Sequence, residues 1–62
     1  MKFFTVLTNT MTHERKDKEM TQQELTSIVG EYVVSRAVEL GQTNTTIINK
    51  GQTYKMQIKA VK

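Results

Sequence analysis

One segment of this 62-residue sequence carries a start signal, an apolar stripe and a stop signal for a helix. Thr21 is followed three residues later by Glu24, the pair that forms a capping box. Apolar residues then recur at helical spacing from Leu25 to Leu40. Gly41 supplies the left-handed residue at which many helices end. The sequence therefore predicts one helix over residues 22–40.

The segments on either side of this helix have the composition of strands. Residues 2–10 are rich in Phe, Val and Thr, and residues 43–49 contain two adjacent isoleucines. Residues 52–61 alternate between apolar and polar side chains, as a strand with one buried face does. A turn at Asn49-Lys50-Gly51 joins the last two strands into a hairpin.

Residues 11–20 form the most densely charged part of the chain and show neither a helical nor a strand period. We expect an exposed loop here, with a hairpin extension of the first strand as the alternative. The expected architecture is a single α+β domain with the order β-α-β-β. One helix covers a three-stranded, mainly antiparallel sheet of spatial order 1-3-2, on the face that carries Tyr54, Met56 and Ile58.

Composition argues against catalysis and against metal or cofactor binding. The chain has no cysteine and one histidine, His13, which cannot build a zinc site by itself. No pattern places a base beside a nucleophile, and no glycine-rich phosphate loop is present. We therefore expect a protein that is not an enzyme and has no small-molecule substrate.

A chain this short is marginally stable without disulfides, a metal or a partner chain. We therefore expect a homodimer that also binds an unidentified protein. On the predicted helix, a second apolar strip is either a contact surface or part of a wide face under a curved sheet. The candidate interface residues are Gly30, Val34 and Val38 of this strip, with Phe3, Leu7 and Ile47 of the strands.

The last third of the chain holds lysines and no acidic residue. The candidate nucleic-acid contacts are Lys50, Lys55, Lys59, Lys62 and Arg36. Lysines that share one face of a strand can neutralise successive phosphates. The alternative is that they solvate the sheet and protect it from edge pairing, while Arg36 packs its apolar stem near the helix end.

These features favour a small regulatory or accessory protein that acts by binding another protein. A tiny domain without catalytic groups resembles the accessory proteins of bacteriophages and mobile elements, which implies a similar role here. A nucleic-acid-binding module using the lysine face is the alternative, and a self-assembling structural protein is the third option. The apolar run at residues 3–7 is too short for a signal peptide or a membrane span, so we expect a soluble cytoplasmic protein without membrane partners.

Overall fold

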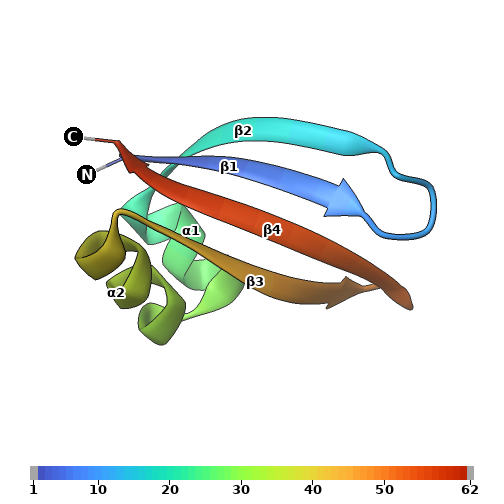
Figure 1. Cartoon of the computed structure of the whole chain (residues 1–62). Helices are drawn as coiled ribbons and strands as arrows, with labels where there is room; N and C mark the ends of the chain where they lie inside the picture. The colour runs from blue at the N-terminus through green and yellow to red at the C-terminus, as the bar shows by residue number, and fades with distance from the viewer. Residues whose placement is uncertain (1, 62) are drawn as a thin grey trace.

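A computed structural model describes residues 2–61, which form four strands and two helices. In chain order these are β1 (Lys2–Asn9), β2 (Arg15–Thr21), α1 (Gln22–Val29), α2 (Glu31–Leu40), β3 (Gln42–Asn49) and β4 (Gln52–Val61). The strands form one sheet in the order β2-β1-β4-β3, and all neighbours are antiparallel (Figure 1).

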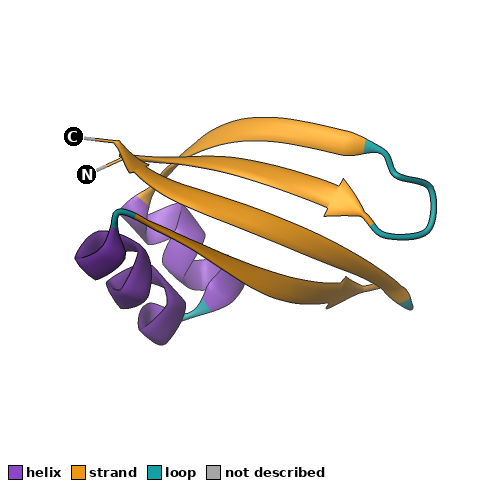
Figure 2. Ribbon diagram, in the orientation of Figure 1, coloured by secondary structure: helices purple, strands orange, loops and turns teal. Residues whose placement is uncertain are grey.

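Both helices pack on the same face of the sheet, near the end where β1 begins and β4 ends (Figure 2). We call this the inner face, and the opposite one the outer face. α1 contacts β1 and β2, whereas α2 contacts β3 and β4. The core between the two layers consists of Phe3, Met20, Leu25, Val34, Ala37, Met56 and Ile58.

The α+β class and several details of the predicted architecture are confirmed. β4 lies between β1 and β3, as the predicted order 1-3-2 of those three strands requires. Met56 and Ile58 are buried under the helices, while Lys55 and Lys59 are exposed. The capping box is present too: the Glu24 amide donates to Thr21 Oγ1 at 3.2 Å, and the Thr21 amide donates to Glu24 Oε1 at 3.3 Å.

The predicted loop at residues 11–20 is wrong, because most of this segment is the strand β2. It pairs with β1 along its whole length, which is the hairpin extension that the sequence left open. An edge strand needs few buried side chains, and Met20 is the buried residue of β2. The hydroxyl of Thr5 adds a hydrogen bond to the Lys18 carbonyl at 2.8 Å. The sheet therefore has four strands and not three.

The single predicted helix is also wrong, because Gly30 divides it into α1 and α2. Gly30 has φ 88° and ψ 164°, far from helical values, and its amide donates to the Thr26 carbonyl at 2.9 Å. The change of direction lets α2 bury Val34 in the core. The predicted apolar strip of Gly30, Val34 and Val38 along one helix therefore does not exist.

Candidate protein-binding surface

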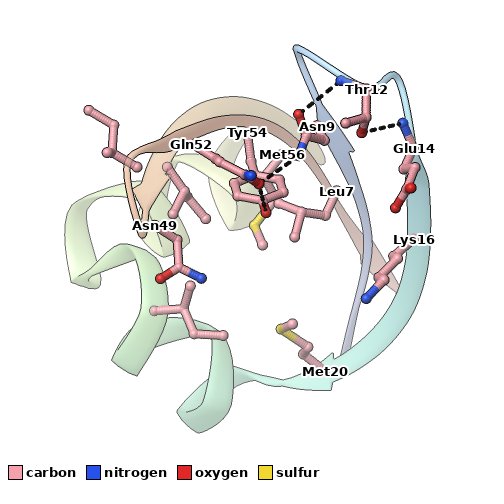
Figure 3. A pocket seen from close by; sticks show the side chains of 13 residues that line it. Leu7, Asn9, Thr12, Glu14, Lys16, Met20, Asn49, Gln52, Tyr54 and Met56 are labelled. Carbon is pink, nitrogen blue, oxygen red and sulfur yellow. Dashed lines mark hydrogen bonds between the residues drawn. The ribbon is translucent and has the colours of Figure 1, made fainter.

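The helices cover only one end of the inner face, and the hairpin ends of the sheet extend beyond them (Figure 1). A cavity of about 670 Å³ opens in the uncovered part. We call it the inner groove; Leu7, Met20, Met56 and Tyr54 are among the side chains that surround it in Figure 3. The apolar residues that line it are Leu7, Met20, Ile28, Ile47, Ile48, Tyr54 and Met56, and the charged residues Glu14 and Lys16 also line it. An apolar concave surface of this kind suits apolar side chains of a ligand.

Two hydrogen bonds to Gln52 connect three polar side chains at the groove. The Asn9 amide nitrogen donates to Gln52 Oε1 at 2.9 Å, and the Tyr54 hydroxyl donates to the same oxygen at 2.8 Å (Figure 3). Asn9 Oδ1 accepts from the amides of Met11 and Thr12, at 2.8 and 3.2 Å. Asn9 is buried and its amide oxygen and nitrogen are both bonded, so it holds the β1–β2 loop in place.

Beside the groove, β3 forms an open edge of the sheet and contains no charged residue. The amide of Ala60 donates to the Gly41 carbonyl at 2.9 Å, in register with the β3–β4 pairing. Backbone groups alternate in direction along an antiparallel strand. Odd-numbered residues of β3 therefore face β4, and even-numbered ones face outward. The outward amides and carbonyls belong to Gln42, Asn44, Thr46 and Ile48, and we call them the β3 edge.

The opposite edge of the sheet is protected. β2 begins with five consecutive charged residues, from Arg15 to Glu19. Two ion pairs involve these residues. Lys2 Nζ of β1 lies 3.4 Å from Glu19 Oε1, and Arg15 Nε lies 3.1 Å from Asp17 Oδ1 within β2. Charged side chains on an edge strand oppose pairing with another chain. The two edges therefore differ, and only the β3 edge is uncharged.

The predicted interface residues separate into four environments. Phe3 and Val34 are core residues, Gly30 forms the break between the helices, and Val38 is exposed on α2. Leu7 and Ile47, which lie forty residues apart in the sequence, both line the inner groove. The sequence did not predict Asn9, Gln52 and Tyr54 at the groove, since their hydrogen bonds depend on the pairing of β1 with β4.

The predicted nucleic-acid contacts are not all brought together. Lys55 and Lys59 lie on the outer face of β4, whereas Arg36 is exposed on α2, in the other layer. Lys50 lies in the β3–β4 turn with φ 53°, and Lys62 lies outside the described residues. The outer face also carries an exposed aromatic residue, Phe4, which the sequence analysis did not assign to the lysine face.

Among residues 2–61 there is no group of three or more His, Cys, Asp or Glu side chains that could hold a metal ion. His13 is exposed in the β1–β2 loop, with φ 62°. Neither helix in this part of the chain is long and apolar enough to span a membrane.

Comparison with known proteins gives no match: no family model fits the chain, and no curated protein or solved structure is similar to it at a significant level. The functional argument therefore depends on the surface itself.

Proposed function

We propose that this protein is a non-enzymatic regulatory or accessory protein that binds another protein by strand addition at the β3 edge. One observation carries the proposal: the uncharged edge strand reaches the apolar inner groove at its C-terminal end, where Ile47, Ile48 and Asn49 line the groove. Strand addition takes its affinity from main-chain hydrogen bonds and its specificity from pockets for alternate side chains. The β3 edge supplies the main-chain hydrogen-bonding groups, and the inner groove supplies the pocket for side chains.

The partner that fits this surface is an extended segment with an apolar residue at every second position. Four residues of the β3 edge each offer one amide and one carbonyl, and a typical hydrogen bond contributes about 0.5–1.5 kcal/mol net. Alternate side chains of the added strand would lie on the inner face beside Ile47, at the groove. Ile48, which is exposed and also lines the groove, adds further apolar contact.

A second copy of the chain is the first partner that we propose, and it would compete with any other protein for the β3 edge. Two β3 edges can pair around a twofold axis, the commonest arrangement for identical chains. Because β2 is charged, this pairing uses the one uncharged edge and self-association stops at two chains. A homodimer is therefore favoured over an extended assembly.

The absence of cysteine suits a reducing compartment, so we propose that the protein is located in the cytoplasm.

Peptide selection against a proline variant tests the strand-addition mode. The Thr46 amide points outward, so Thr46→Pro removes a donor from the β3 edge but no hydrogen bond to β4. Thr46→Ala keeps that amide and serves as the matched control. Peptides are selected from a displayed random library against the wild-type protein, and their affinities for the three proteins are compared.

We expect selected peptides with alternating apolar residues that bind Thr46→Ala as they bind the wild type. Their affinity for Thr46→Pro should fall roughly tenfold or more, which corresponds to about 1.4 kcal/mol and the loss of at least one hydrogen bond. Peptides that bind Thr46→Pro as tightly as the wild type would show that the β3 edge is not the binding surface.

A further inference from the structure

The outer face of the sheet is free of helices and presents an ordered set of side chains. Both helices lie on the inner face, so β1 and β4 expose their other side at the centre of the sheet (Figure 2). The strand register places Phe4 opposite Lys59, Val6 opposite Gln57, and Thr8 opposite Lys55. β3 extends the first two of these rows with Gln42 and Asn44.

Phe4 is an aromatic side chain near the start of the inner strand β1 and is 38% exposed. It borders a shallow hollow of about 250 Å³ together with Val6 and Lys59. The amide side chains Gln42, Asn44 and Gln57 line the same hollow. An exposed ring beside hydrogen-bonding amides matches the chemistry of an unpaired nucleobase, which stacks on an aromatic ring and presents donors and acceptors at its edge.

The charges around Phe4 also fit a phosphate backbone. Within residues 2–61, both acidic residues of the outer face are ion-paired: Glu19 with Lys2, and Asp17 with Arg15. Neither of those pairs involves Lys55 or Lys59. These two lysines are four residues apart on one strand, about 14 Å at 3.4 Å per residue. They can therefore contact separate phosphates while a base stacks on Phe4, which lies opposite Lys59.

We infer that the outer face binds a single-stranded nucleic acid, with Phe4 stacking on a base and Lys55 and Lys59 contacting phosphates. A single strand fits better than a duplex, because stacking on Phe4 requires an unpaired base. The site lies on the face opposite the inner groove. Either function can therefore fail without the other.

Fluorescence anisotropy with labelled oligo(dT), oligo(U) and a DNA duplex tests this inference in low salt and over a salt series. The variants are Phe4→Ala, the conservative Phe4→Tyr, and Lys55→Gln combined with Lys59→Gln. Lys16→Gln combined with Lys18→Gln is the matched control: it removes the same charge from β2 positions whose side chains are on the inner face. All of the substituted lysines are exposed, and thermal unfolding verifies that each variant is folded.

We expect the wild type to bind at least one single strand more tightly than the duplex. Phe4→Ala should weaken binding roughly 5- to 150-fold, the equivalent of about 1–3 kcal/mol per stacked base, and Phe4→Tyr should retain it. The Lys55/Lys59 variant should reduce the slope of log K against log salt by about 1.4, at roughly 0.7 per phosphate. The inference is overturned if the wild type does not bind in low salt, if it prefers the duplex, or if the Lys16/Lys18 control loses as much affinity.

Discussion

At Gly30 the backbone adopts a conformation that is essentially restricted to glycine. A Cβ atom there would meet nothing within 4 Å, so any cost of Gly30→Ala comes from the backbone alone. In a continuous helix the same substitution would stabilise the protein by about 1 kcal/mol. We predict instead a loss of about 1–3 kcal/mol in the free energy of unfolding. Denaturant titration of Gly30→Ala, with Ser35→Ala as an exposed control on α2, shows whether the substitution lowers or raises the free energy of unfolding. A raised midpoint for Gly30→Ala would argue for one continuous helix.

For the elements, local signals determined what could be predicted from the sequence. The helix start at Thr21, the end at Gly41 and the alternation of β4 were readable because each depends on neighbouring residues. β2 was missed because an edge strand with one buried residue has no apolar period. The break at Gly30 was missed because the helical spacing of apolar residues continues through it, although the helical backbone conformation does not. The groove brings Leu7 and Ile47 together, but the hydrogen bonds of Asn9 require a register that the sequence alone does not reveal.

The backbone amides of β3 alternate in direction, and this alternation gives a prediction about proline substitutions in the strand. Thr45 directs its amide toward β4, whereas Thr46 directs its amide outward. Thr45→Pro therefore breaks a hydrogen bond of the ladder, and we expect it to cost about 1–3 kcal/mol more than Thr46→Pro. Chemical denaturation of both variants measures the difference. Equal destabilisation would mean that the alternation inferred for β3 is not correct, and that Thr46→Pro is unsuitable as a test of edge binding.

For the whole molecule, the β3 edge defines the geometry of the dimer that we propose. A twofold axis perpendicular to the sheet keeps both inner faces on the same side. The register with most hydrogen bonds pairs Gln42 of one chain with Ile48 of the other, and Asn44 with Thr46. Thr45 then lies on the axis, opposite its own copy. In this arrangement the helices of each chain approach the uncovered end of the other chain's sheet, beside the inner groove. In the proposed dimer, two four-stranded sheets would thus form one eight-stranded sheet.

Oxidative cross-linking of a Thr45→Cys variant tests this account most directly, because the chain contains no other cysteine. Residues opposite each other in a non-hydrogen-bonded antiparallel pair have Cα atoms about 4.5 Å apart, within disulfide range. Asn44→Cys is a control just off the axis, where the two copies lie about 7–8 Å apart, and Asp17→Cys is a control on the charged edge. At micromolar concentration under mild oxidant, we predict a disulfide-linked dimer for Thr45→Cys and little for either control. A Thr45→Cys protein that stays monomeric, or links no faster than Asp17→Cys, would contradict pairing through β3.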